Sequence, residues 1–169
     1  MNIKKLNQFI ELIANTLHIY SAKTYKDGSI VFCNYIKKGY YENGQLLLEV
    51  PYVLGIKHGI LKEYYKSGEL FIETTYSNGE RHGIKKGYYE NGKLKYECSY
   101  TKDIKHGVQK WYYTSGELFI ETTYVNGKEH GIYKEYDENG KLKEESRYVD
   151  GRLYDTNNYD ENGKLIIKN

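Results

Sequence analysis

Four histidines recur at a fixed spacing in this chain, and histidine is the side chain that most often binds metals or transfers protons near neutral pH. They lie 24 residues apart, each directly before a glycine: His58, His82, His106 and His130. If two strands separate successive histidines, they lie about 10 Å apart along a sheet. Zinc ligands must converge to about 2 Å from one ion. We therefore expect no metal site, and we expect each histidine to pack on the neighbouring turn.

Lysines and glutamates, which could serve acid–base catalysis, repeat in the same way. They are Lys38, Lys62, Lys86, Lys110 and Lys134, and Glu49, Glu73, Glu97, Glu121 and Glu145. Because each occurs once per repeat, we interpret them as solvated cross-strand charge pairs, each worth well under about 1 kcal/mol. Cys33 and Cys98 lack metal-ligand spacing, which is typical of reduced thiols in a cytoplasmic protein. No nucleophile elbow, phosphate loop or HExxH motif occurs, so we expect no enzyme activity and no cofactor.

A repeat of 24 residues positions all of these side chains. Its turns are marked by Gly44, Gly68, Gly92, Gly116 and Gly140, and Gly163 follows after 23 residues. Such a period indicates a stacked array and not a globular fold with one enclosed site. The 169 residues include 21 Tyr and 17 Gly but one Pro, which favours strands and tight turns. The net charge of +2 demands no polyanionic partner, and no segment is apolar for long enough to span a membrane.

Residues 84–107 illustrate one repeat. We predict a strand over Ile84–Tyr89, a hairpin turn over Glu90–Lys93 and a return strand over Leu94–Tyr100. In the turn that follows, Asp103 stands where other repeats have glycine, and aspartate tolerates left-handed backbone better than most residues. Successive hairpins predict a mainly β fold, an elongated single-layer antiparallel β-meander that must twist.

Two hairpin registers fit this pattern. A two-residue Asn-Gly loop places Lys86 opposite Glu97, whereas a bulged loop places Tyr88 opposite Leu94. We favour the bulge because it gathers large side chains on one face, namely Ile84, Tyr88, Leu94, Tyr96 and Tyr100. Tyrosine suits a one-layer sheet, since its ring can be buried while its hydroxyl reaches water.

The first residues follow a different pattern. Apolar side chains fall at intervals of three and four residues: Ile3, Leu6, Ile10, Ile13, Leu17 and Tyr20. This is one face of an α-helix, and its polar interruptions argue against a secretory signal. We divide the chain into an N-terminal amphipathic capping helix, residues 1–23, and a β-hairpin repeat array, residues 24–169. The helix either covers the bare end or face of the array or binds a partner.

A family resemblance rests on these motifs. Tyr-Tyr-Glu-Asn-Gly-Lys-Leu-Lys at 88–95, followed by Glu97, Tyr100 and His106-Gly107, resembles the bacterial variant of the MORN repeat. The resemblance covers residues 36–169, where the motif recurs five times. It implies an antiparallel β-hairpin array that acts as a scaffold and as a protein-binding or lipid-associated surface. Bacterial proteins built from this variant are often classed as antitoxin-like.

We expect a non-enzymatic, cytoplasmic, protein-binding scaffold, because Tyr with Lys and Glu suits protein recognition. Our narrower hypothesis is an antitoxin or immunity-type inhibitor that restrains a toxin or an effector enzyme. Two alternatives stay open. One is peripheral membrane binding through a basic or aromatic face, and the other is single-stranded nucleic acid stacked on tyrosines. The glutamate column opposes nucleic acid, and we expect no DNA partner.

The predicted partner site consists of aromatic residues that depart from the repeat. Phe71 and Phe119 occupy positions that hold Lys95 and Lys143 in other repeats. Residues that only build the repeat should not alternate in this way. Phe71 lies nearer the predicted helix, and Phe119 lies about 20 Å further along the sheet. The predicted partner-binding residues are Trp111, Tyr113, Phe119, Tyr89 and Phe71.

Overall fold

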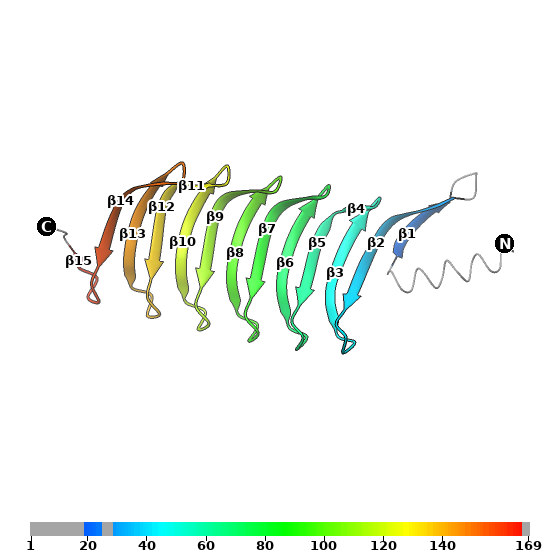
Figure 1. The fold of residues 1–169 in the computed structure, drawn as a ribbon, viewed down its shortest axis with the longest axis horizontal. Coiled ribbons are helices and arrows are strands. Elements are labelled where there is room, and N and C mark those ends of the chain that lie inside the picture. The colour runs from blue at the N-terminus through cyan, green and yellow to red at the C-terminus, as the bar shows by residue number, and fades with distance from the viewer. Residues whose placement is uncertain (1–18, 25–28, 167–169) are drawn as a thin grey trace.

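The chain forms one antiparallel sheet of 15 strands, seen in a computed structural model that describes residues 19–24 and 29–166. Strands that follow each other along the chain are neighbours in the sheet, so the fold is a meander. Figure 1 shows the hairpins in a single row, with the described chain running from one end of the row to the other. The predicted elongated, single-layer β-meander is therefore confirmed.

Each repeat contributes one strand that enters a long turn and one that leaves it. The entering strands are β2 (Ile30–Tyr40), β5 (Gly59–Tyr64), β7 (Glu80–Tyr88), β9 (Ile104–Tyr112), β12 (Gly131–Tyr136) and β14 (Arg152–Tyr159). The returning strands are β3 (Leu46–Val53), β6 (Leu70–Ser77), β8 (Leu94–Thr101), β10 (Leu118–Val125), β13 (Leu142–Val149) and β15 (Leu165–Ile166). Two short strands, β4 (Ile56–Lys57) and β11 (Lys128–Glu129), precede β5 and β12 and pair with β3 and β10.

The first strand corrects the predicted N-terminal boundary. Strand β1 (Ile19–Thr24) pairs with β2, so residues 19–23 are extended and the predicted helix does not reach residue 23. Residues 1–18 lie outside the described part of the chain, and with them lies the rest of the helix prediction. Pairing with the edge of β2 is a non-local interaction that helical periodicity does not contain. The described sheet thus begins at Ile19 and not at residue 24.

Turns of two kinds alternate along the sheet. The long turns span 41–45, 65–69, 89–93, 113–117, 137–141 and 160–164, and we call their side the long-turn edge. In one of them the Tyr89 carbonyl accepts the Gly92 N–H at 2.9 Å, and Gly92 has a φ of 78°. This is a type I turn closed by a left-handed glycine, the usual three-residue hairpin loop.

The opposite side, the tight-turn edge, has two-residue turns at 54–55, 78–79, 102–103, 126–127 and 150–151. Both residues of each turn have positive φ, for example 51° at Asn78 and 88° at Gly79, as type I′ turns require. Asp103 adopts a φ of 64° after Lys102 at 51°. The predicted left-handed aspartate is therefore confirmed.

A bulge next to the long turn sets the hairpin register. Tyr88 pairs with Leu94, yet Lys86 pairs with Glu97 in the same hairpin, because the register shifts after Gly87. Both pairings that the sequence presented as alternatives therefore occur together.

The predicted grouping of large side chains on one face is wrong. Ile84 pairs with Ser99, whereas Tyr100 pairs with Gly83. Directly paired residues share a face and neighbours along a strand do not, so Ile84 and Tyr100 lie on opposite faces. The bulge adds Lys95 to β8, so Tyr88 and Leu94 lie on one face while Tyr96 and Tyr100 lie on the other. A pattern of residue types does not reveal where a bulge falls.

The buried core is thin, and Gln109 and Tyr100, with exposed fractions of 5% and 9%, belong to it. The rest is a column with one side chain per repeat. Its members have exposed fractions of 7% at Val50, 5% at Thr74, 5% at Cys98, 5% at Thr122 and 1% at Ser146. All are small or medium in size, and larger side chains of the same face surround them. Each repeat is thus stabilised mainly by its immediate neighbours, as in other linear arrays.

Hydrogen bonds at both edges connect successive repeats. At the long-turn edge a tyrosine hydroxyl donates to a carbonyl of the next hairpin, as from Tyr89 to Tyr112 at 2.7 Å. The same bond recurs from Tyr41 to Tyr64, from Tyr65 to Tyr88 and from Tyr113 to Tyr136. At the tight-turn edge the Gly79 N–H donates to the Lys57 carbonyl at 2.8 Å. The tyrosine after each entering strand is therefore a clamp between repeats.

Candidate binding surfaces

Cross-strand pairing assigns the side chains to two faces of different composition. The aromatic face carries Tyr52, Tyr76, Tyr96, Tyr100, Trp111, Tyr124, Tyr133 and Tyr148. The charged face carries the lysine and glutamate columns. It also carries a row of aliphatic side chains that are close to half exposed, Ile60, Ile84, Val108 and Ile132.

The charged face is neutralised within itself. Lys38 contacts Glu49 at 3.1 Å and Lys110 contacts Glu121 at 3.3 Å, which confirms the predicted cross-strand pairs. The Tyr88 hydroxyl donates to a carboxylate oxygen of Glu73 at 2.9 Å. Burial, followed by this hydrogen bond, raises the pKa of Tyr88 to about 12. These contacts keep the tyrosine hydroxyl protonated as a donor to the glutamate.

The aromatic face is densest at its centre. The rings of Tyr96 and Trp111 lie 4.8 Å apart between centroids, and Gly87 lies beneath the Tyr96 ring, where a Cβ would overlap it. Basic side chains lie over other rings, with the Arg81 guanidinium 4.5 Å from the Tyr100 centroid. Tyrosine, tryptophan and arginine are the residues that most often dominate binding energy at protein interfaces.

The five predicted partner-site residues do not form one patch. Tyr113 and Phe119 pack together at the long-turn edge, with ring centroids 4.7 Å apart. Tyr65 and Phe71 form an equivalent pair, also at 4.7 Å, two repeats earlier. Trp111 instead packs on Tyr96 of the aromatic face.

Tyr89 lies in the repeat between the two tyrosine–phenylalanine pairs. The Nζ of Lys95 lies 5.4 Å from its ring centroid, so a cation takes the place of the phenylalanine. The segment Ser67–Tyr76 is identical in sequence to Ser115–Tyr124. This identity indicates a second period of 48 residues, and the two phenylalanines Phe71 and Phe119 are one part of it.

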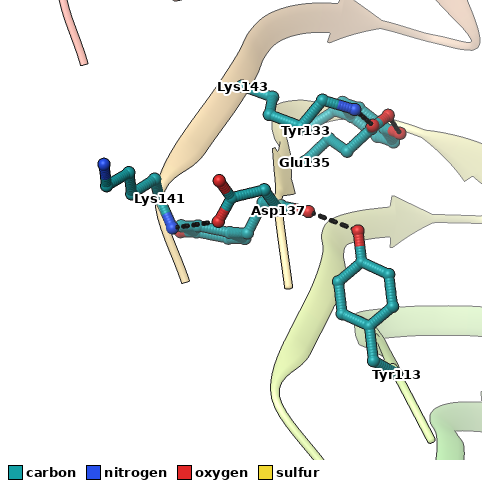
Figure 2. A network of polar contacts seen from close by, with 7 residues as sticks. Tyr113, Tyr133, Glu135, Asp137, Lys141 and Lys143 are labelled. Carbon is teal, nitrogen blue, oxygen red and sulfur yellow. Dashed lines mark hydrogen bonds and ion pairs between the residues drawn. The ribbon is translucent and has the colours of Figure 1, made fainter. Parts of the chain in front are cut away.

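One carboxylate replaces the clamp tyrosine in the last full repeat (Figure 2). Asp137 stands at the clamp position, and its carboxylate accepts the Lys141 N–H at 2.8 Å. Backbone hydrogen bonds from Lys141 and Asn139 hold the pKa of Asp137 below its ordinary value. Nearby, the Lys143 ammonium donates to Glu135 at 2.7 Å. The clamps from the preceding repeats end here, with Tyr113 donating to the Tyr136 carbonyl.

The repeated histidines are exposed, and two of them contact the neighbouring turn. The Asn78 N–H points at Nδ1 of His58, and the Asp150 N–H points at Nδ1 of His130, each at 3.5 Å. For these two histidines the predicted packing on the next turn is confirmed. Within the described residues no group of three or more potential metal ligands converges. No helix in that part of the chain is long and apolar enough to cross a membrane.

The fold and its surfaces define a linear β-hairpin repeat protein. The family model described as "MORN repeat variant" matches residues 36–53, 57–78, 81–102, 105–126 and 129–150. These matches cover more than half of the chain, which therefore belongs to the MORN repeat variant family. MORN repeats are generally associated with binding to proteins or membranes.

No curated protein matches the chain at a significant level. Among solved structures it is similar to part of TarM in two crystal structures, one titled as an S. aureus TarM mutant in complex with fondaparinux, alpha-GlcNAc-glycerol and UDP. The identities are 13% and 12% and the TM-scores 0.37 and 0.38. Each alignment covers 73% of this chain but only 23% of the TarM chain.

Proposed function

We propose that this chain is a non-enzymatic, protein-binding scaffold whose partner contacts the long-turn edge. The observation that carries the proposal is the pair of matching aromatic clusters, Tyr65 with Phe71 and Tyr113 with Phe119. The phenylalanine positions hold lysine in the repeat between and in the repeat after. Phe71 keeps 36% of its surface exposed, although its ring has a packing partner. Exposed aromatic side chains of this kind suit protein recognition.

The two clusters lie on the same edge and are separated by four strands, which is about 19 Å. One partner of ordinary interface size can contact both clusters, because a standard interface buries about 800 Å² on each side. Simultaneous contact with both would raise the overall affinity above that of either cluster alone. The matching sequence of the two segments is consistent with such two-point binding.

The narrower proposal is that binding restrains the partner in the bacterial cytoplasm, as an antitoxin or immunity-type inhibitor restrains a toxin or effector enzyme. Its support is the antitoxin-like classification of bacterial proteins that share this repeat variant. Co-expression with each genomic neighbour tests it. We expect one neighbour to arrest growth alone and to be relieved by this protein. If the Phe71→Ala/Phe119→Ala variant still relieves the growth arrest, the inhibition does not depend on the proposed surface.

Capture from the native host with the tagged full-length chain tests the partner surface. We expect Phe71→Ala and Phe119→Ala each to weaken capture of the same partner several-fold, and the double variant to lose nearly all of it. Tyr154→Ala is the matched control, because Tyr154 is 68% exposed and lies on β14, away from both clusters. If the double variant binds as well as the control, or loses binding only in proportion to its unfolded fraction, the assignment is wrong.

A further inference from the structure

The proposed function uses the tyrosine–phenylalanine pairs at the long-turn edge and assigns no role to the aromatic face. A sheet normally buries its apolar face against a second layer, and the described chain supplies one layer only. Tyr96 and Trp111, at the centre of this face, remain partly exposed. The face therefore has the composition of an interior but lies at a surface.

The charges of the aromatic face change sign along the sheet. One position, always opposite a tyrosine, holds Lys57, Arg81, Lys105 and then Glu129 in successive repeats. Two further glutamates, Glu135 and Glu144, are cross-strand neighbours just beyond, and Glu135 forms an ion pair with Lys143. Lys85 adds to the basic part, while Glu63 is an acidic exception within it. The charged face differs, because its lysines and glutamates alternate along the sheet.

The sign change falls on either side of Tyr124. The Lys105 ammonium lies 4.7 Å from the Tyr124 ring centroid, and the Tyr124 hydroxyl donates to Glu129 at 3.2 Å. Lys105 also donates to the Gln109 side chain at 3.1 Å. Among the described residues, neither Lys105 nor Glu129 forms an ion pair with an opposite charge. Both charges are thus available to a partner.

We propose that two copies of this chain pair through their aromatic faces in an antiparallel arrangement. A two-fold axis parallel to β10, midway between the faces, exchanges the strands on either side of β10. Lys105 of each copy then lies over Glu129 of the other, and Tyr124 lies near the axis. The same axis places Arg81 and Lys85 of β7 over β14, so the charge complementarity rests on Lys105 and Glu129, which meet twice. Such an interface is isologous and closes after two copies.

The sign change favours a second copy over an unrelated partner. A face of one sign attracts many opposite charges, whereas Lys105 and Glu129, which lie on either side of β10, are self-complementary when the two copies run in opposite directions. The parallel arrangement would bring like charges together and is disfavoured. Two sheets in contact also form the aligned sandwich, about 10 Å thick, in which aromatic side chains interdigitate. In this arrangement Trp111 of each copy lies over Glu135 of the other, because both residues pair with Ile120 of β10, and Lys143 neutralises the Glu135 carboxylate.

Sedimentation of the full chain and its charge variants at micromolar concentration tests the proposal. We expect the natural chain to be a dimer, and Lys105→Glu and Glu129→Lys each to dimerise at least about tenfold more weakly, because each variant faces like charges. An equimolar mixture of these two variants should dimerise again, since each reversed charge then meets its opposite. The Lys105→Glu/Glu129→Lys double variant should dimerise alone.

Lys86→Glu is the matched control, because it makes the same charge change on the charged face. It should leave the dimer intact. A natural chain that remains monomeric, an effect of Lys86→Glu equal to that of Lys105→Glu, or a mixture that does not recover dimers would each overturn the proposal. Circular dichroism shows whether a single variant is folded. Recovery of dimers in the mixture shows that a variant lost pairing and not its fold. Phe71→Ala and Phe119→Ala should leave the dimer unchanged, so failure here is distinct from failure of the proposed function.

Discussion

Gly87 shows how one residue determines local packing on the aromatic face. A Cβ at Gly87 would overlap the ring of Tyr96. One repeat earlier the same position holds Glu63, opposite the smaller Ile72. We therefore predict that Gly87→Ala destabilises the protein by about 1–3 kcal/mol through overpacking, measured by urea unfolding. In a Tyr96→Ile background the same substitution should cost little, and an equal cost in both backgrounds would contradict the packing account.

The Arg81–Asp103 pair predicts a pH dependence. The Arg81 Nε donates to Asp103 at 2.7 Å, and this bond holds the pKa of Asp103 below its ordinary value. Because that pKa is lowered on folding, the stabilisation is present above the unfolded pKa of about 3.9 and is lost as pH falls through the folded value. Asp103→Asn should therefore lower the melting temperature at neutral pH, and the difference from the natural chain should close as the pH falls through the lowered pKa of Asp103.

Glu80→Gln is the control for this pair, because Glu80 is exposed on the tight-turn edge. Its difference from the natural chain should be small and should not follow the Asp103→Asn curve. A constant difference between Asp103→Asn and the natural chain from neutral to acidic pH would show that the substitution acts through the left-handed turn and not through the charge.

At the scale of the strands and turns, the sequence predicted the features that recur in every repeat. It missed the features that depend on contacts between distant residues or on bulges. The hairpins, the left-handed Asp103 and the Lys–Glu pairs follow from residue types at fixed spacing. The predicted boundary between residues 23 and 24 was wrong because residues 19–23 form a strand by pairing with β2, and helical periodicity does not reveal that pairing. The faces of Tyr96 and Tyr100 were wrong because the bulge in β8 changes side-chain alternation without a clear signal in the sequence. Trp111 was wrongly grouped with Phe119, because two residues that are close in sequence need not lie on the same face of the sheet.

The clamp tyrosines predict how repeats are coupled. Tyr113→Phe removes the hydroxyl that donates to the Tyr136 carbonyl at 2.8 Å, and it should destabilise the protein by about 0.5–1.5 kcal/mol. In a linear array the loss should be local. Hydrogen exchange should therefore accelerate in β12 and β13 more than in β3. Tyr154→Phe, at a side chain that is 68% exposed, is the control, and uniform acceleration across the sheet would contradict local coupling.

At the scale of the whole molecule, a row of hairpins without a second layer makes the chain long. A compact domain of this length has a radius of gyration of roughly 15 Å. We predict a clearly larger value by small-angle X-ray scattering, because strands stacked about 4.8 Å apart extend the sheet in one direction. Antiparallel pairing about β10 adds thickness and makes the particle longer than one chain, because β10 lies nearer the C-terminal end of the sheet. A value near that of a compact domain would mean that the sheet closes or folds back in solution.

The charge of the whole molecule bears on the membrane and nucleic-acid alternatives. Both modes depend on lysine and arginine contacts with phosphates, and both weaken steeply with salt. The net charge is only +2, and the basic part of the aromatic face ends at Glu129. We therefore predict no binding to anionic vesicles or to single-stranded oligonucleotides at physiological salt, measured by co-sedimentation and fluorescence anisotropy. Micromolar binding to either ligand would favour that alternative. If Lys105→Glu loses this binding and Lys86→Glu keeps it, the ligand binds the aromatic face and competes with the second copy.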